Sequence, residues 1–153
     1  TISTYCQFQS ASSLTASGTN VLWYSSSSGG VGSGTAPTPI TSISGVQFFY
    51  VSQTNMGCES ARGVFTVQIN FTPSAPVVSP NQQVYCQFST VTGIAIPGIG
   101  IQWYTASLGG VNLGGVLTPN TSLAGVYTYY VSQSNGVCES ARVPFFTTVV
   151  GLP

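Results

Sequence analysis

The chain has 153 residues, of which 42% are hydrophobic and only 3% carry a charge, against roughly 25% in an ordinary soluble domain. It contains two acidic and two basic side chains and no histidine. Nucleic-acid binding needs several basic residues, metal sites need clustered His, Cys or carboxylates, and acid–base catalysis needs a suitable general base. We therefore expect no enzyme activity, no cofactor or metal and no nucleic-acid partner. Because no run approaches about 20 apolar residues, we also expect no membrane insertion.

An internal repeat divides the chain into two copies. Tyr5-Cys6-Gln7-Phe8 recurs as residues 85–88, Trp23-Tyr24 recurs as 103–104, and Cys58-Glu59-Ser60-Ala61-Arg62 recurs as 138–142, all at one spacing and without a gap. A period of this length indicates an array of whole domains rather than a solenoid of smaller units. The predicted domains are residues 1–73 and residues 74–153, the second beginning with a proline-rich linker at 74–80.

The first copy has no counterpart of residues 74–80, which we interpret as the linker together with the first strand of the second domain. Two explanations are open. Either the segment is a window on a longer array of domains, or the missing first strand is donated by a neighbouring molecule.

The strand at residues 21–24 alternates between its two faces, and the second copy shows which face is buried. Leu22 becomes Gln102, so this face tolerates water, and Trp23 and Trp103 are predicted to point into the core. A tryptophan can also stack on a sugar ring. The inward phase favours a core position instead.

Two further strands are expected in each copy. In the strand around residues 48–51, position 48 loses its apolar character in the second copy, so Phe49 and Val51 should face the core and Tyr50 the outside. Phe65, Val67 and Ile69 form a third inward set, echoed by residues 145 and 149. Gly-rich and Asn-Gly turns separate these strands, and no helical period is present. The pattern predicts an all-β fold, a small β-sandwich in each copy with a tryptophan on its third strand.

Four cysteines allow three pairings, and the repeat favours one bridge in each copy. The expected disulfides are Cys6–Cys58 and Cys86–Cys138, which would require an oxidising compartment and hence an exported protein. The alternatives are four buried free thiols, or metal ligation by two cysteines in each copy.

The charged residues of the chain are Glu59, Arg62, Glu139 and Arg142. On a regular strand, residues three apart point to opposite faces, so these side chains could form ion pairs only if each glutamate still belongs to a turn. Three roles are open: a structural pair across a turn or bulge, a contact with the next domain, or a contact with another molecule.

The remaining aromatic residues suggest a contact surface. If the strands at 21–24 and 48–51 are neighbours, Tyr24 and Tyr50 should lie together on an outer face. The second copy would present an equivalent set, consisting of Tyr104, Tyr130 and Phe146. Such a surface could bind a glycan, bind a neighbouring chain, or bind nothing.

The motifs resemble those of one family. Tyr-Cys-Gln, Trp-Tyr, Gly-Gly, Tyr-Val-Ser-Gln and Cys-Glu-Ser-Ala-Arg, in this order in both copies, are similar to the immunoglobulin-like repeats of large secreted and surface proteins of Bacteroidetes, including gliding-motility adhesins and polysaccharide-degrading proteins exported by the type IX system. The first copy departs from the pattern at Asn55-Met56-Gly57. The resemblance implies tandem immunoglobulin-like sandwiches and carries no catalytic residues.

These observations together predict a non-catalytic extracellular segment of a cell-surface adhesin, stalk or filament that provides extension and contacts. Its expected partners are other copies of itself or neighbouring repeats, because a net charge of zero removes the repulsion that keeps proteins apart. The alternative is a carbohydrate-binding or spacer module of a secreted polysaccharide-degrading enzyme, with a glycan as partner.

Overall fold

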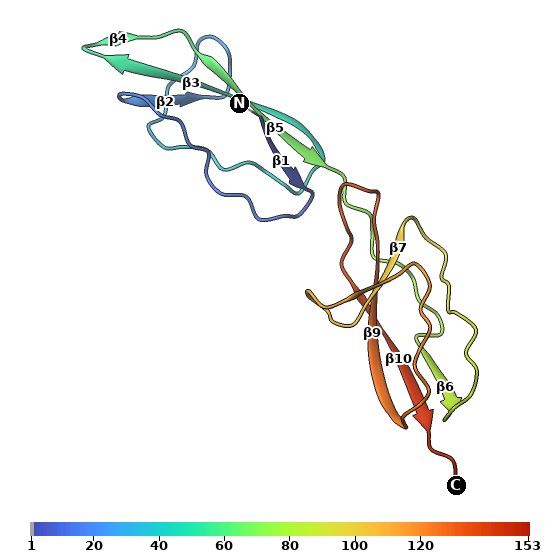
Figure 1. Ribbon diagram of the computed structural model, residues 1–153. Helices are drawn as coiled ribbons and strands as arrows, with labels where there is room; N and C mark the ends of the chain where they lie inside the picture. Colours follow the sequence, from blue (N-terminus) through green and yellow to red (C-terminus); the bar gives the residue numbers. More distant parts are fainter. Residues whose placement is uncertain (1) are drawn as a thin grey trace. The chain divides into compact units, whose positions relative to one another are not determined.

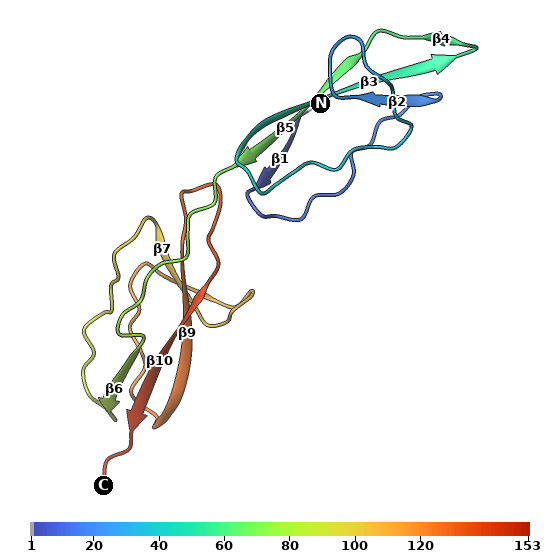
Figure 2. The same cartoon turned by 180° about the vertical axis from the view of Figure 1, so that it is seen from behind.

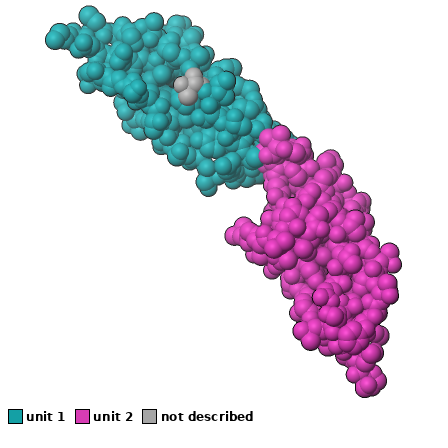
Figure 3. All heavy atoms as spheres, viewed as in Figure 1, with its two compact units in different colours: residues 1–71 teal, residues 72–153 magenta. Residues whose placement is uncertain are grey.

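A computed structural model describes residues 2–153, so the first residue of the first predicted domain, Thr1, lies outside the described residues. The chain divides into two compact units, residues 1–71 and 72–153 (Figure 3). Every regular element within residues 2–153 is a β-strand. The predicted all-β class is therefore confirmed.

Unit 1 contains one sheet with the order β1-β5-β3-β2, in which β4 pairs with β3 (Figure 1). Its strands are β1 (Ile2–Cys6), β2 (Val21–Tyr24), β3 (Gly45–Asn55), β4 (Cys58–Glu59) and β5 (Gly63–Asn70). β1 and β5 run parallel, with Ile2 beside Thr66 and Cys6 beside Asn70, and the other pairs are antiparallel. Both views show β1 lying along β5 (Figures 1 and 2).

Unit 2 contains one sheet with the order β6-β10-β9-β7-β8. Its strands are β6 (Gln82–Cys86), β7 (Ile101–Tyr104), β8 (Asn112–Gly114), β9 (Gly125–Gln133) and β10 (Val143–Val150). β6 and β10 run parallel in the same way as β1 and β5. Four strands therefore follow one order in both units, and the fifth differs, because β4 pairs with β3 whereas β8 pairs with β7.

The linker at residues 74–80 contains no strand, so the expected first strand of the second domain is wrong. Both tryptophans accordingly lie on the second strand of their unit rather than the third. The segment nevertheless contributes to the fold, because Pro76 is buried and Val78 packs against the core of unit 2. Prolines at 73, 76 and 80 lack the amide hydrogen that a sheet ladder requires, which explains the absence of a strand.

Each sheet is covered on one face by extended segments outside the named strands, which makes each unit sandwich-like. In unit 1, the amide of Leu14 donates to the carbonyl of Pro37, and the amide of Phe8 donates to the carbonyl of Thr41. In unit 2, Ile94 and Leu117 form an isolated antiparallel bridge with backbone bonds in both directions. The segments that these few bonds join form a second layer over each sheet.

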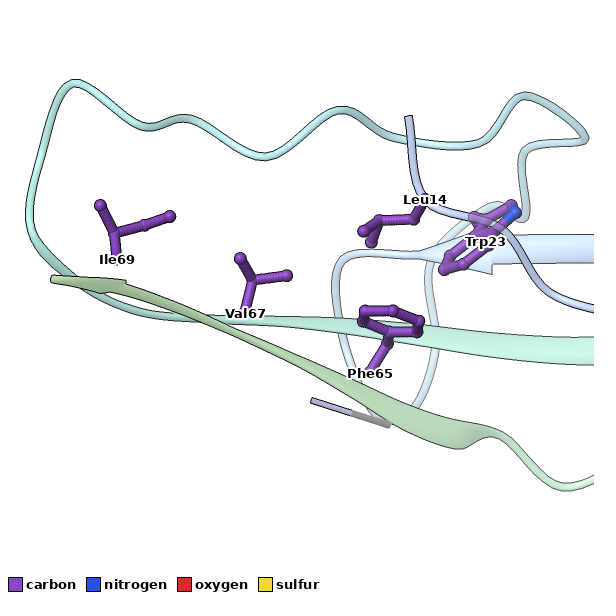
Figure 4. Close-up of a cluster of buried hydrophobic side chains, with 5 residues drawn as sticks. All are labelled: Leu14, Trp23, Phe65, Val67 and Ile69. Carbon is purple, nitrogen blue, oxygen red and sulfur yellow. The ribbon is translucent and has the colours of Figure 1, made fainter. Parts of the chain in front are cut away.

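The core of unit 1 lies between these two layers. Leu14 from the covering segment forms one buried cluster with Trp23, Phe65, Val67 and Ile69 from the sheet, and it lies nearest to Trp23 and Phe65 (Figure 4). Phe49 and Val51 pack against the same cluster. The predicted inward positions of all three strands are confirmed, because period-two alternation places every second side chain on the same face.

The core of unit 2 repeats this packing with fuller burial. Trp103 and Val131 are 0% exposed, and Phe145 packs edge-on against the indole with ring centroids 5.5 Å apart. Leu117 supplies the covering residue in place of Leu14. The predicted core role of Trp23 and Trp103 is confirmed, which removes both indoles as sugar-stacking platforms.

Candidate functional site

The charged residues of unit 1 form one cluster around the ring of Tyr24. The guanidinium carbon of Arg62 lies 3.3 Å from the centroid of that ring, a cation–π contact. The carboxylate of Glu59 accepts hydrogen bonds from the hydroxyl of Tyr24 at 2.5 Å and from the hydroxyl of Ser52 at 2.6 Å. Three strands and the segment before β5 therefore converge on a single tyrosine.

Unit 2 contains the same cluster with one change of partner. The guanidinium carbon of Arg142 lies 3.3 Å from the ring centroid of Tyr104, and Ser132 donates to Glu139 at 2.6 Å. Here the arginine Nε also contacts the glutamate Oε1 at 3.4 Å, an ion pair three residues apart. Glu139 forms an isolated bridge with Ser134 rather than lying in a regular strand, so the strand rule that opposes residues i and i+3 does not apply.

Each arginine also holds a loop in place. Arg62 Nη1 donates to the carbonyls of Ser26 and Gly29 at 2.8 and 2.7 Å, and Arg142 Nη1 donates to those of Ala106 and Gly109 at the same distances. Gly29 and Gly109 have φ values of 65° and 62°, in the left-handed region that glycine tolerates best. The repeated Gly-Gly signal therefore marks a turn that an arginine fastens to the sheet.

The hydrogen bonds to Glu59 change its acidity. Donation from Ser52, then from Tyr24, stabilises the carboxylate and lowers the pKa of Glu59 below its ordinary value of 4.5; the field of Arg62 acts in the same direction. Partial desolvation opposes this shift without cancelling it. The glutamate is therefore held as an anion, which suits a structural acceptor and is the opposite of the raised pKa that a general acid requires.

The expected exposed tyrosine surface is wrong for Tyr24 and Tyr104. Both side chains are 8% exposed, because an arginine lies over each ring. They do lie directly opposite Tyr50 and Tyr130 in the neighbouring strand, so the expected shared face exists. On that face, Tyr24 on β2 and Tyr104 on β7 are covered rather than free.

Three aromatic side chains of the predicted surface remain partly accessible. Tyr50 on β3 and Tyr130 on β9 are half-buried on interior strands of their sheets, and Phe146 on β10 is half-buried as well. Pro144 lies opposite Tyr130, and Phe146, two residues further along β10, shares its face. This surface is narrower than the sequence predicted.

Ser52 and Ser132 were missed as functional positions by sequence reasoning. They are 4% and 0% exposed, and each donates to the glutamate of its unit. The available signal was the exact repetition of Ser between Val and Gln in both copies, since a polar residue in a strand that faces a charged residue usually serves as its hydrogen-bond partner.

The match to a known protein family covers nearly the same residues as unit 2. Residues 73–150, just over half of the chain, match the family model described as "Ig-like domain CHU_C associated", a domain associated with Bacteroidetes. The chain belongs to this family. No curated protein matches the chain. The resemblance seen in the sequence is thereby confirmed, and the all-β units can be called Ig-like domains.

The cysteines of the Ig-like domains do not pair as predicted. Cys6 and Cys138 are disulfide-bonded, whereas Cys58 and Cys86 are free and exposed. Neither Cys6–Cys58 nor Cys86–Cys138 therefore forms, and the expectation of one disulfide within each domain is wrong.

The strand register explains why a bridge inside one domain cannot form. In unit 1, Cys6 lies beside Asn70, where β5 ends, while Cys58 lies beside Asn55, at the far end of β3. β3 has 11 residues, and a strand of this length spans about 33 Å at roughly 3.3 Å per residue. Bridged cysteines need Cα atoms within about 7 Å.

Unit 2 places its cysteines in the same way. Cys86 lies beside Val150, where β10 ends, and the carbonyl of Cys138 accepts from Asn135, beyond the other end of β9. We call Cys6 and Cys86 the exit cysteines, because the last strand of each domain finishes beside them, and Cys58 and Cys138 the hairpin cysteines. Both views show β4, which begins with Cys58, far from the end of β1 (Figures 1 and 2).

Residues 2–153 contain no cluster of three metal-ligating side chains and no helix of the length and apolarity that crossing a bilayer demands. The charged side chains that the sequence offered as candidate sites make the contacts described above within their own Ig-like domains.

Proposed function

We propose that this chain is a non-catalytic segment of an extracellular repeat protein, a stalk, adhesin or filament at the cell surface, exported by the type IX system. One observation carries the proposal. In each domain the glutamate accepts from a serine, and the arginine lies over a tyrosine and donates to the loop that contains the Gly-Gly turn. Within residues 2–153 the charged side chains are thus engaged in holding each domain together, and extension and contact are the functions that this arrangement supports.

The composition of the surface supports a role in contacts. Many large apolar side chains are exposed, including several at the exit end of unit 2, namely Phe88, Leu123 and Val126, which are 67%, 67% and 70% exposed. Exposed apolar surface without charge favours burial against another protein surface. Membership of an Ig-like family agrees with a module that connects and presents rather than catalyses.

The alternative of a carbohydrate-binding module has less support. Stacking on a sugar requires an aromatic ring with a free face, and Arg62 and Arg142 lie over the rings of Tyr24 and Tyr104. The buried tryptophans cannot serve either. We therefore place self-contact ahead of glycan binding.

Light scattering across salt concentrations tests the proposal. We would use the double variant Cys58→Ser with Cys86→Ser, so that only non-covalent association is measured. Because few charges exist to be screened, the apparent mass at a given protein concentration should change by less than about twofold between low salt and 1 M salt. The matched variant Val126→Lys should associate less, since it places a charge in exposed apolar surface. A protein that stays monomeric at every concentration, or that dissociates at high salt, would contradict the proposal.

A further inference from the structure

A groove on unit 1 occupies the place that the linker fills on unit 2. It has a volume of about 160 Å³, and the side chains that line it include Ala16, Ser17, Val21, Val51 and Gln53. The repeat aligns these positions with Ile96, Pro97, Ile101, Val131 and Gln133 of unit 2. Residues 2–71 align with residues 82–151, so no described residue of unit 1 corresponds to the linker at 74–80.

In unit 2 the linker covers the equivalent positions without forming a strand. Val78 packs against the core cluster that contains Ile101 and Val131. The side-chain amide of Gln133 donates from Nε2 to the carbonyl oxygen of Ser74 at 2.6 Å. An apolar side chain and a backbone carbonyl group therefore anchor the segment, and both contacts involve residues whose counterparts line the groove of unit 1.

Gln53 is positioned in unit 1 as Gln133 is positioned in unit 2. Oε1 of Gln53 accepts from the amide of Thr19 at 3.3 Å, and Oε1 of Gln133 accepts from the amide of Ile99 at 3.0 Å. This bond orients each side-chain amide and leaves its Nε2 atom as a donor. Nε2 of Gln133 binds the linker, whereas Nε2 of Gln53 has no hydrogen-bond acceptor within the described residues 2–153.

The apolar floor of the groove on unit 1 is more exposed than its counterpart. Val21 and Val51 are half-buried, whereas Ile101 and Val131 are 9% and 0% exposed. Removing apolar surface from water is favourable by about 25 cal/mol for each Å². A segment that lays a branched apolar side chain over these two valines would therefore be stabilised, as Val78 is in unit 2.

We propose that the groove on unit 1 binds a linker segment of the type of residues 74–80, supplied by a further copy of the repeat. The bound segment is extended and forms no strand. The carbonyl at its Ser74 position accepts from Nε2 of Gln53, and the side chain at its Val78 position covers Val51. This inference rests on the proposed function, because it requires a protein with further copies of the repeat.

The lining of the groove favours this class of segment. None of the described residues that line it is charged or aromatic, so a charged peptide would find no ion pair there and a sugar would find no ring on which to stack. The linker is itself uncharged, and its prolines restrict the backbone before binding, so less conformational entropy is lost. Ala16 and Ser17 are smaller than Ile96 and Pro97, which leaves room for the backbone of the segment.

A peptide with the sequence of residues 72–81 tests this occupant. When it is added to the unaltered chain labelled with nitrogen-15, the NMR resonances of Val51 and Gln53 should shift and saturate at one peptide for each chain. The resonances of Val131 and Gln133 should stay in place, because the linker of unit 2 already covers them. Unit 2 is thus the internal control of the same experiment.

A covalent graft raises the effective concentration of the segment. Residues 72–80 are placed directly ahead of Thr1, which gives them the spacing that they have ahead of Asn81. In the grafted chain, the Nε2 proton resonances of Gln53 should move towards those of Gln133, and the exchange of these protons with solvent should slow by about tenfold or more. The same graft carrying Val78→Asp is the matched control and should produce neither change.

Two variants of the groove test the contacts that the proposal assigns. Gln53→Glu keeps the acceptor for the amide of Thr19 and removes the Nε2 donor, so it should weaken peptide binding by about tenfold or more. Ala16→Phe places a ring in the groove from an exposed position, so it should abolish binding while the chain stays folded.

Three results would overturn the proposal. The first is a graft that leaves the Gln53 resonances unchanged. The second is a set of peptide shifts that survives both Gln53→Glu and Ala16→Phe, or that is as large in unit 2 as in unit 1. The third is a shift of the same resonances when the chain is concentrated without peptide, which would assign the groove to self-contact. Because the light-scattering test contains no peptide, failure of peptide binding and failure of the proposed function give different results.

Discussion

Tyr24 shows, at the level of one residue, how a side chain on the outer face of a sheet becomes buried. The ring lies opposite Tyr50, as alternation along the strands predicted, yet it is 8% exposed. Alternation fixes the face on which a residue lies. It does not reveal that Arg62, from the segment before β5, lies across that face. The position of the tyrosine was therefore predictable, and its burial was not.

Glu59 gives this cluster a dependence on pH. Its pKa is lowered in the folded chain, so the folded state binds this proton less readily than the unfolded state. The stabilisation is present above the ordinary pKa of 4.5 and is lost as the pH falls through the lower folded value. Urea unfolding at a series of pH values should show a free energy of unfolding that declines over this acid range, and Glu59→Gln should flatten the decline.

Tyr24→Phe is the control for that measurement, because it removes one donor to Glu59 and keeps the ring beneath Arg62. We expect an intermediate slope, since Ser52 remains the larger cause of the lowered pKa. An acid decline as steep in Glu59→Gln as in the unaltered chain would show that other groups produce it.

Strands β5 and β10 occupy the same place in their domains, and one of their buried positions is apolar in the first strand and carries a hydroxyl in the second. Val67 on β5 and Thr147 on β10 are both 0% exposed. The hydroxyl of Thr147 has no hydrogen-bond partner. An unpaired buried hydroxyl costs about 1–3 kcal/mol, whereas a methyl group in the same place costs nothing of this kind.

Thr147→Val should therefore raise the free energy of unfolding by about 1–2 kcal/mol, because the two side chains have nearly the same shape. Val67→Thr should lower it by a similar amount in the other domain, and serves as the reciprocal variant. Urea unfolding followed by tryptophan fluorescence measures both, since each domain contains one tryptophan. A destabilised Thr147→Val would mean that the hydroxyl is hydrogen-bonded in solution.

The sheet of each domain was predictable from the sequence to a greater degree than the layer that covers it. Phe65, Val67 and Ile69 alternate with polar residues, and this local pattern correctly gave the core face of β5. The covering segments are rich in Ser, Thr and Gly and form only isolated backbone bonds, such as that between Leu14 and Pro37. No periodic pattern marks such segments, so Leu14 and Leu117 were not expected in the core.

The disulfide pairing failed as a prediction because a repeat shows which residues are equivalent and not which are close. Cys6 and Cys58 belong to one copy, yet the parallel pairing of β1 with β5 places Cys6 at the end of the sheet opposite Cys58. Parallel pairing of two strands that are distant in sequence leaves no local signal. The charged cluster was easier to place, since its members recur together in both copies.

At the scale of the whole chain, the linker belongs to the fold of the second domain. Pro76 is buried, Val78 packs against the core, and the carbonyl of Ser74 accepts from Gln133 at 2.6 Å. Although the linker forms no strand, packed side chains and a side-chain hydrogen bond therefore hold it against the second domain.

Fragments of the second domain test this contribution. Residues 72–153 under reducing conditions should unfold with a free energy about 1–3 kcal/mol higher than residues 81–153, because the shorter fragment exposes the core that Val78 and Pro76 cover. Thermal or urea unfolding of the two fragments gives the difference directly. Equal stabilities would show that the linker only rests on the surface.

The side-by-side parallel pairs, β1 with β5 and β6 with β10, have a mechanical consequence for a stalk. Tension that enters a domain through its first strand and leaves through its last pulls the two strands in opposite directions along their length. The rungs from Ile2–Thr66 to Cys6–Asn70, and those from Gln82–Phe146 to Cys86–Val150, are then loaded together in shear, rather than one after another as in an unzipping hairpin. A domain built in this way resists rupture under a pull from its ends.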